Sequence, residues 1–278
     1  MPIRETNGYF KNLYLYPGIK KPGKVKLPLI SIITPTFNVE ETIERNIQNV
    51  IRQDYKHIEH IFVDNCSADN TVALISKYQK EYPHIRLLTG KDEGIYDALN
   101  KGMEKSAGDW FYFLGADDEL YNDQILSELV AEGWFEREEV IYGDVLINND
   151  APWAKDATVY DGPFTLEKLL QKNICHQSIF YPGSVKAKIG FYSLKYPVTA
   201  DWDYNVRCYA NYPFKYLNRI IAVFKGGGKS SEKDVNSFYR DLPQKVIAYF
   251  RLNPDDPANL DPGSPFRILI QRYKNTSY

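Results

Sequence analysis

Polar and acidic side chains follow directly after three short segments of this 278-residue chain that we predict to be strands. The segments are residues 29–33, 58–63 and 110–114, and the side chains after them are Thr34, Thr36, Asn38, Asp64, Asn65, Asp117 and Asp118. Each group alone is typical of turn chemistry. In an open parallel sheet, however, ligands bind beyond the carboxyl ends of the strands. If the three segments are parallel strands, we expect these side chains to converge on one binding site.

The adjacent carboxylates Asp117 and Asp118 indicate the chemistry of that site. No GxGxxG motif follows the first apolar segment and no GxxxxGK[ST] motif occurs, which argues against a dinucleotide dehydrogenase and a P-loop NTPase. Carboxylates repel a diphosphate unless a divalent cation lies between them, and Mg²⁺ and Mn²⁺ prefer oxygen ligands. We therefore expect Mg²⁺ or Mn²⁺, which would stabilise a departing phosphate as a Lewis acid.

The elements that position these residues alternate between strand and helix. Short apolar runs predict strands at residues 29–33, 58–63, 85–88 and 110–114, and apolar spacing predicts helices at 43–51, 72–82 and 95–103. Asn38 is placed to cap the first helix. The alternation predicts an α/β fold with a mostly parallel, doubly wound sheet flanked by helices. After residue 123 the pattern loosens, with helices expected at 125–130 and 199–210, strands at 140–147, 177–181 and 214–224, and a terminal helical part interrupted by Pro243.

Composition excludes several classes of protein. The formal net charge of −2 provides no global basic field, so we expect no nucleic-acid partner. Three cysteines at wide spacing form neither a CxxC metal site nor a disulfide framework, which fits a reducing compartment. No apolar run approaches the roughly 20 residues of a membrane span. We expect a cytoplasmic protein.

The first 28 residues form a leader rich in lysine and tyrosine. Two readings stay open for it. The leader either packs on the following domain as a solvated segment, or it contacts an anionic membrane surface. The second reading would place the protein at the inner face of the membrane, as a peripheral membrane protein.

Four motifs, in this order, resemble the family-2 glycosyltransferases with the GT-A fold. They are Ser31–Asn38, Phe62–Asp69, Gly94–Gly102 and Gly108–Asp118. The form that starts at Asp92, Asp-x-Gly-Ile-Tyr-Asp-Ala, is similar to a subgroup that builds bacterial surface polysaccharides such as lipopolysaccharide. The resemblance covers roughly residues 29–120, with a further match near residue 200. It implies a GT-A catalytic domain at 29–230, with a nucleotide-binding half (29–120) and an acceptor-binding half (121–230), and a helical extension at 231–278.

The resemblance also implies roles for single residues. The nucleotide would lie against Pro35, Thr36, Asn38, Asp64, Asp97, Asn100, Ala116 and Asp117, and the metal would bind Asp117 and Asp118. Two positions depart from the family pattern. Gly115 replaces the first Asp of the D-x-D metal motif, so Asp118 or water must complete the coordination. Leu99 stands where the family usually has an arginine, so one nucleotide contact is missing.

In the second half of the chain, Ala200–Asp203 resembles the family's E-D-x-D segment, which implies that Asp201 is the catalytic base. We read Asp203 and Arg207, four residues apart, as a pair on the helix surface. Trp202 lines the sugar pocket or packs in the core. His176 is either structural or binds acceptor or phosphate. Lys229, in the Gly226–Ser231 loop, belongs either to a simple turn or to a lid over the diphosphate.

These observations predict an inverting, metal-dependent glycosyltransferase. It would move a sugar from a nucleoside-diphosphate sugar, UDP being favoured, to a glycan or lipid-linked acceptor in bacterial surface polysaccharide synthesis. Two alternatives stay open. One is a non-catalytic module that binds a sugar nucleotide or glycan. The other is a sugar nucleotidyltransferase, although residues 34–38 lack the Gly-rich basic loop that such an enzyme needs.

Overall fold

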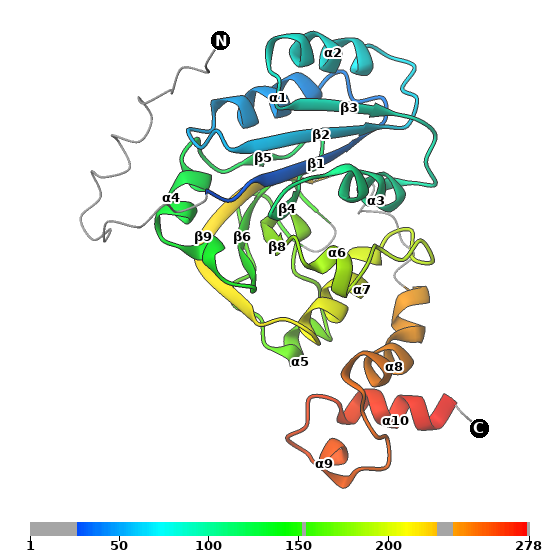
Figure 1. The fold of residues 1–278 in the computed structure, drawn as a ribbon. Coiled ribbons are helices and arrows are strands. Elements are labelled where there is room, and N and C mark those ends of the chain that lie inside the picture. Colours follow the sequence, from blue (N-terminus) through cyan, green and yellow to red (C-terminus); the bar gives the residue numbers. More distant parts are fainter. Residues whose placement is uncertain (1–26, 152–153, 227–235, 277–278) are drawn as a thin grey trace.

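The computed structural model describes residues 27–151, 154–226 and 236–276 (Figure 1). Within these ranges, no helix is both long and apolar enough to cross a membrane. Residues 1–26 of the predicted leader and the lid candidate Lys229 lie outside the described residues.

One curled, nine-stranded sheet runs through the molecule in the order β3-β2-β1-β4-β8-β6-β9-β5, with β7 paired to β6. The strands are β1 (Ile30–Thr36), β2 (Ile58–Asp64), β3 (Ile85–Thr89), β4 (Trp110–Phe113), β5 (Glu119–Leu120), β6 (Val140–Asn148), β7 (Val159–Tyr160), β8 (Ile179–Pro182) and β9 (Phe214–Lys225). Strands β3, β2, β1 and β4 are parallel. Strand β8 is antiparallel to β4 and β6, while β6 and β9 are parallel. The predicted α/β fold with a mostly parallel sheet is confirmed.

Helices cover both faces of the parallel strands (Figure 1). On one face lie α1 (Ile43–Arg52) and α2 (Thr71–Glu81), where Ile47 and Ile75 pack with Phe62 of β2. On the other face lies α3 (Ile95–Lys105), where Met103 packs with Val63. Adjacent residues of one strand therefore enter different cores, which explains why Ile61, Phe62 and Val63 of β2 are all apolar.

The second half of the chain adds short helices and an aromatic core. The helices are α4 (Ile125–Ala131), α5 (Leu166–Leu169), α6 (Val185–Lys188) and α7 (Ala200–Tyr209). Tyr181, Tyr192 and Tyr204 pack against one another in this core. The strand predicted at 177–181 begins only at Ile179, because residues His176–Ser178 form a 3₁₀ turn.

The C-terminal part consists of α8 (Asn236–Phe250), α9 (Pro257–Leu260) and α10 (Arg267–Thr276). We expected Pro243 to interrupt α8, but the helix continues through it. Proline lacks an N–H and so leaves the carbonyl four residues earlier without its helical partner. That carbonyl, of Tyr239, accepts a hydrogen bond from Arg272 of α10 (2.8 Å). A tertiary contact therefore compensates for the missing helical bond.

The predicted helix cap at Asn38 is wrong. Helix α1 begins five residues later, at Ile43, and Asn38 has a positive φ of 52°. Its side-chain Oδ1 instead accepts a hydrogen bond from the backbone N–H of Ala68 (2.9 Å). A short polar side chain tolerates this backbone conformation. Asn38 thereby joins the loops that follow β1 and β2.

Candidate active site

Hydrogen bonds connect the loops at the carboxyl ends of β1, β2 and β3. Asp64 is fully buried at the end of β2, and its carboxylate accepts from Thr36 Oγ1 (3.1 Å), Ser67 N (2.9 Å) and Ser67 Oγ (2.6 Å). Asn65 Oδ1 accepts from the backbone N–H of Asp92, in the loop before α3 (2.9 Å). The predicted nucleotide residues Thr36, Asn38 and Asp64 therefore lie together, as the strand topology requires.

The residues predicted on α3 have different surroundings. Asp97 pairs with Lys101 (2.8 Å) and accepts from the backbone N–H of Glu93. Burial acts to raise the pKa of Asp97, but these two hydrogen bonds hold it below its ordinary value. Asn100 donates to the carbonyl of Tyr192 and accepts from its N–H, so its amide orders that loop. Leu99, which stands in place of an arginine, is buried in the core.

Helix α1 holds the turn that carries Asp117 and Asp118. Asn46 Nδ2 donates to the carbonyls of Gly115 (2.9 Å) and Asp118 (3.1 Å). Asn49 makes both a donor and an acceptor hydrogen bond with the backbone of Leu120 (3.0 and 2.8 Å). Gln53 donates to the carbonyl of Asn122 (2.7 Å). These side chains, spaced three and four residues apart, form a polar stripe along the inner face of α1 and its C-terminal capping residue, Gln53. We call Asn46, Asn49 and Gln53 the amide stripe.

Asp118 is buried and points inward. Its Oδ1 accepts from the backbone N–H of Lys225 at the end of β9, and its Oδ2 accepts from Gln177 Nε2, both at 2.8 Å. Burial, reinforced by the neighbouring charge of Asp117, raises the pKa of Asp118 to about 7. Its carboxylate therefore connects the turn that carries Asp117 and Asp118, which we call the Asp turn, to β9 and to the 3₁₀ turn at His176–Ser178.

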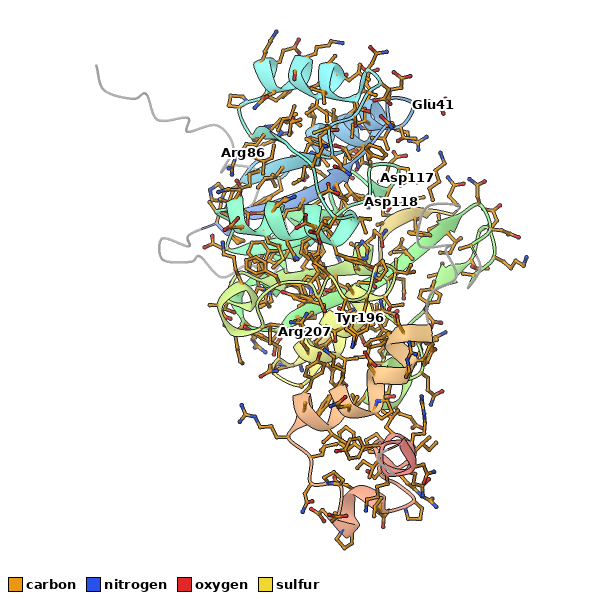
Figure 2. The ribbon with its side chains drawn as sticks, turned by 90° about the vertical axis from the view of Figure 1, so that its right-hand side faces the viewer. Glu41, Arg86, Asp117, Asp118, Tyr196 and Arg207 are labelled. Carbon is orange, nitrogen blue, oxygen red and sulfur yellow. The ribbon has the colours of Figure 1, made fainter. Side chains whose placement is uncertain are left out.

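Asp117 is the more accessible of the two acids, and its carboxylate makes no hydrogen bond or ion pair with another described residue. Burial raises its pKa, which the charges of Lys225 and Arg45 partly offset. Figure 2 shows Asp117 and Asp118 side by side at one edge of the sheet, with Arg86 at the opposite edge. The Asp117 carboxylate has oxygens free to bind a metal ion. A divalent cation bound there would offset the negative charge of the two adjacent acids.

The residues present fit a metal held mainly by Asp117. A side chain at position 115 would overlap Asp118 Oδ2, so the Asp118 carboxylate occupies the space of the missing first Asp of the motif. No three His, Cys, Asp or Glu side chains gather as a ligand set within the described ranges. Mg²⁺-type ions are commonly held by one or two carboxylates, with substrate phosphates and water completing the shell. A single free carboxylate is sufficient for that mode.

Asp201 lies in the first turn of α7 and faces the same region. Its Oδ1 accepts from Tyr96 Oη and from the backbone N–H of Trp202, both at 2.9 Å. Its Oδ2 accepts from Asn173 Nδ2 (2.8 Å) and lies 3.3 Å from His176 Nδ1. These partners come from three separate segments of the chain and hold the carboxylate in one orientation.

The adjacent residues His176 and Gln177 connect the two acidic centres. Gln177 contacts Asp118, and His176 contacts Asp201. Cys175 Sγ donates to Gln177 Oε1 (2.9 Å), which orients the amide so that its NH₂ faces Asp118. The structure thus brings together Asp117, Asp118, His176 and Asp201, although they come from distant parts of the sequence. Pro35 and Ala116 border the same edge of the sheet, with Ala116 packed against α1.

Two neighbours of Asp201 belong to the protein interior. Trp202 is buried against Phe238 and Tyr239, and its indole N–H donates to the carbonyl of Leu169 (2.7 Å). Of its two readings, the structure favours the core. Our surface assignment of Asp203 is wrong, because its side chain is 0% exposed. Besides Arg207, it contacts Tyr249 Oη (2.6 Å) of α8. Helix α8 covers the face of α7 that the sequence periodicity predicted to be exposed to solvent.

Several functional neighbours escaped the sequence analysis. Tyr96 and Asn173 hold Asp201, Asn46 holds the Asp turn, and Lys225 and Arg45 are the cations that act on Asp117. Tyr96 lies inside the Gly-Ile-Tyr-Asp motif, and Lys225 directly precedes the glycine run. Their position next to these motifs could have marked both residues as candidates. Asn173 and Arg45 lie in segments without any motif.

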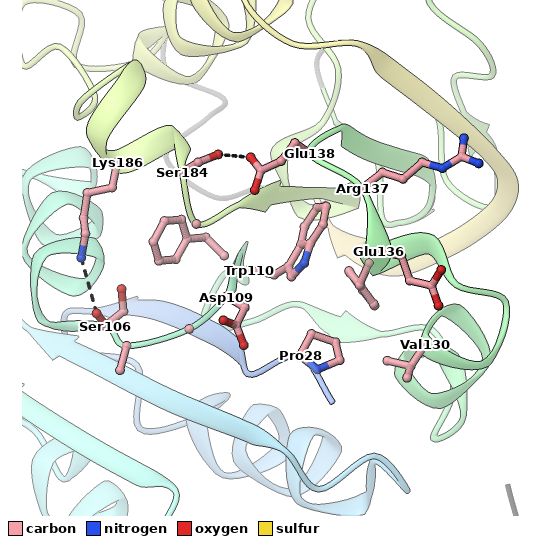
Figure 3. Close-up of a pocket in the computed structure, with 15 residues that line it drawn as sticks. Pro28, Ser106, Asp109, Trp110, Val130, Glu136, Arg137, Glu138, Ser184 and Lys186 are labelled. Carbon is pink, nitrogen blue, oxygen red and sulfur yellow. Dashed lines mark hydrogen bonds between the residues drawn. The ribbon is translucent and has the colours of Figure 1, made fainter. Parts of the chain in front are cut away.

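A cavity of about 660 Å³ lies elsewhere, at the amino ends of β1 and β4 (Figure 3). Pro28, Asp109, Trp110, Glu138 and Lys186 are among the residues that line it. None of the predicted site residues does. The cavity is therefore separate from the candidate active site, because catalytic residues of such sheets lie at the carboxyl ends of the strands.

Comparisons with known proteins identify the class of enzyme to which this fold belongs. Residues 31–184 match the family model described as glycosyl transferase family 2. The "PGL/p-HBAD biosynthesis glycosyltransferase" of Mycobacterium bovis is 35% identical over 233 residues, which span 81% of this chain and 88% of the relative.

Two solved structures share the fold. S. aureus TarS 1–349 in complex with UDP-GlcNAc has a TM-score of 0.68 at 16% identity, covering 88% of this chain and 72% of TarS. The mannosyltransferase PcManGT from Pyrobaculum calidifontis, in complex with GDP-Man and Mn²⁺, has a TM-score of 0.57 at 16% identity, covering 95% and 75%. The chain belongs to glycosyl transferase family 2, and it is a glycosyltransferase.

Proposed function

We propose that this enzyme is an inverting, metal-dependent glycosyltransferase that uses a nucleoside-diphosphate sugar. The observation that carries the proposal is the connection of Asp118 to Asp201 through the adjacent residues Gln177 and His176 (2.8 and 3.3 Å). One acidic centre would anchor the donor diphosphate. The other would accept a proton from the sugar acceptor. Joined in this way, the two centres would lie on either side of one reacting carbon.

In the proposed reaction, an acceptor hydroxyl attacks the anomeric carbon from the face opposite the diphosphate. The new C–O bond forms as the bond to the diphosphate oxygen breaks, and that oxygen keeps the electron pair. The hydroxyl proton passes to the Asp201 carboxylate. A bound divalent cation at Asp117 would stabilise the negative charge on the leaving diphosphate. Tyr96 and Asn173 keep the base oriented, so that little reorganisation is needed during the reaction.

The donor nucleotide is proposed to be UDP, although the two structural neighbours carry a UDP sugar and a GDP sugar. Asp64, Asn65 and the loop after β1 would hold base and ribose. The acceptor is proposed to be a glycan or a lipid-linked glycan of bacterial surface polysaccharide synthesis, which the Asp92–Ala98 motif supports.

A donor screen tests the proposal. The thermal stability of the full chain would be measured with UDP-, GDP-, dTDP- and ADP-sugars, with and without Mn²⁺, because a ligand that binds only the folded state raises the melting temperature. We expect a stabilising shift with UDP-sugars that requires Mn²⁺. NMR of the transferred product would show an inverted anomeric configuration. Metal-independent stabilisation, or a retained configuration, would contradict the proposal.

A further inference from the structure

With a donor bound, the candidate active site would contain more negative charge than one divalent cation offsets. Asp117 and Asp118 are adjacent, and a donor would add the charges of its diphosphate. Two cations act on Asp117, those of Lys225 and Arg45. Arg45 already has partners, because its Nε pairs with Glu119 (2.8 Å) and its Nη2 donates to the carbonyl of Asp117 (3.3 Å).

Lys225 has different surroundings. It is the last residue of β9, and its backbone N–H donates to Asp118 Oδ1 (2.8 Å), which places the residue beside the Asp turn. Its position is further secured by strand pairing with Asn148 and by the hydrogen bond from Gly226 N to the Asn148 carbonyl (2.8 Å). Its ammonium makes no hydrogen bond or ion pair with any residue that the structure describes. The backbone is therefore fixed, while the charge stays available.

We propose that Lys225 is a diphosphate-binding residue, whose ammonium contacts the diphosphate of the donor and of the departing nucleotide. This inference rests on the proposed function, and nothing in the sequence motifs assigned it. A lysine ammonium is a compact cation with three donors, suited to phosphate oxygens. Negative charge on the leaving diphosphate grows as the bond to the sugar breaks, so Lys225 would contribute more in the transition state than in the ground state.

The substitution Lys225→Gln removes the charge and leaves the backbone hydrogen bond to Asp118 in place. Lys225→Arg keeps the charge. Lys215→Gln is the matched control, since Lys215 is an exposed lysine on the same strand at its opposite end. The three variants and the wild-type full chain would be titrated with UDP in the presence of Mn²⁺ by calorimetry, and with uridine by NMR. Melting temperatures would verify that each variant is folded.

We expect Lys225→Gln to weaken UDP binding about 10- to 100-fold, the loss of one charge-assisted hydrogen bond, and to leave uridine binding unchanged. Its kcat should fall as well. Lys225→Arg should retain most of the UDP affinity, and Lys215→Gln should match the wild type. Unchanged UDP affinity in Lys225→Gln overturns the inference, and so does an equal loss for UDP and uridine.

Measurements on the wild-type protein distinguish failure of the Lys225 proposal from failure of the proposed function. If it binds UDP with Mn²⁺ and transfers sugar while Lys225→Gln behaves identically, only the role of Lys225 is overturned. If the wild type binds none of UDP, GDP, dTDP and ADP, the proposed function fails and this inference fails with it.

Discussion

At the scale of single residues, the site gives different surroundings to acids that look equivalent in sequence. Asp117 has an open carboxylate, Asp118 has both oxygens bonded inside the protein, and Asp201 is held by side chains from α3 and from the segment before β8. Asp203, only two residues from Asp201, is part of the core. These acids therefore differ in their hydrogen-bond partners and in their exposure, although their residue type is the same.

We expect Asp201→Asn to lower kcat about 10²- to 10⁴-fold, the usual contribution of a general base, because the amide cannot accept the acceptor's proton. Donor affinity should change little, since the base acts in the transition state. Steady-state transfer and calorimetry with the donor would measure both.

Asp203→Asn is unsuitable as the control for that experiment, since it would disturb a buried ion pair with Arg207. Asp241→Asn is better matched. Asp241 accepts from Tyr196 Oη (2.7 Å) much as Asp201 accepts from Tyr96, but it lies on α8. Near-normal kcat in Asp201→Asn would show that another group is the base.

We expect Asp117→Asn to abolish Mn²⁺-dependent UDP binding and to leave the fold intact, because its carboxylate has no described partner inside the protein. Calorimetry with UDP, with and without Mn²⁺, would test this, and circular dichroism would monitor folding. An unchanged affinity would refute the assignment of Asp117 to the metal.

At the scale of elements, α1 both packs on the sheet and holds the turn of Asp117 and Asp118, and different side chains of the helix serve the two purposes. Its apolar residues pack on the sheet, and its amide stripe binds the backbone of the Asp turn. Ala116 of this turn packs against α1, and α1 also binds the backbone carbonyls of Gly115 and Asp118. Hydrogen bonds from a rigid neighbouring helix therefore define where Asp117 points.

Asn46→Ala should reduce Mn²⁺-dependent UDP affinity and lower the free energy of unfolding by about 1–3 kcal/mol, because it removes the side-chain donor to two carbonyls of the Asp turn. Urea unfolding and calorimetry would measure the two effects. Gln48→Ala, on the exposed face of the same helix, is the control. Loss of stability with normal metal-dependent binding would show that Asn46 stabilises the fold without positioning the acids.

At the scale of the whole molecule, two histidines make folding sensitive to acid. His60 is fully buried in β2, where burial and, secondarily, the charge of His84 lower its pKa well below 6.5. Burial and the charge of Lys56 also lower the pKa of His84. Between these lowered values and 6.5 the unfolded chain binds more protons than the folded one, so the histidines' contribution to stability falls as the pH falls.

We therefore expect the free energy of unfolding of His84→Gln to depend less steeply on pH than that of the wild type between pH 7.5 and pH 5.5. Asp118, whose pKa is raised, acts in the opposite direction in both proteins, so the difference between them isolates the contribution of His84, including its effect on His60. Urea titrations at several pH values would measure it, with the exposed His57→Gln as control. Parallel pH profiles for wild type and His84→Gln would contradict the prediction.

Most of the leader, residues 1–26, lies outside the described residues, but it supports one prediction for the intact protein. If its lysines contact an anionic membrane surface, each contributes about 1 kcal/mol of reversible binding. The full chain should then float with liposomes containing anionic lipid, and a chain lacking residues 1–26 should not. Equal flotation of the two, or flotation of neither, would remove this role for the leader.

Much of the fold was predictable because its signals are local. The apolar residues of each strand, and the residues of each of the four motifs, lie close together in the sequence. They were sufficient for the α/β sheet and for the family. Local signals failed where a distant segment overrode them. Asn38 bonds to Ala68 rather than capping α1, and Arg272 compensates for Pro243.

The pairings inside the site came only from the tertiary structure. Gln177 meets Asp118 across 59 residues of sequence, and the backbone of Lys225 meets it across 107. A sequence motif reports which groups are present, but it carries no information on which carboxylate oxygen is already bonded or which charge is already paired. Those depend on the curled sheet, which brings the ends of β4 and β9 and the turn before β8 to one place. The sequence by itself therefore determined the class of chemistry, and the packing of distant segments decided the surroundings of each acid.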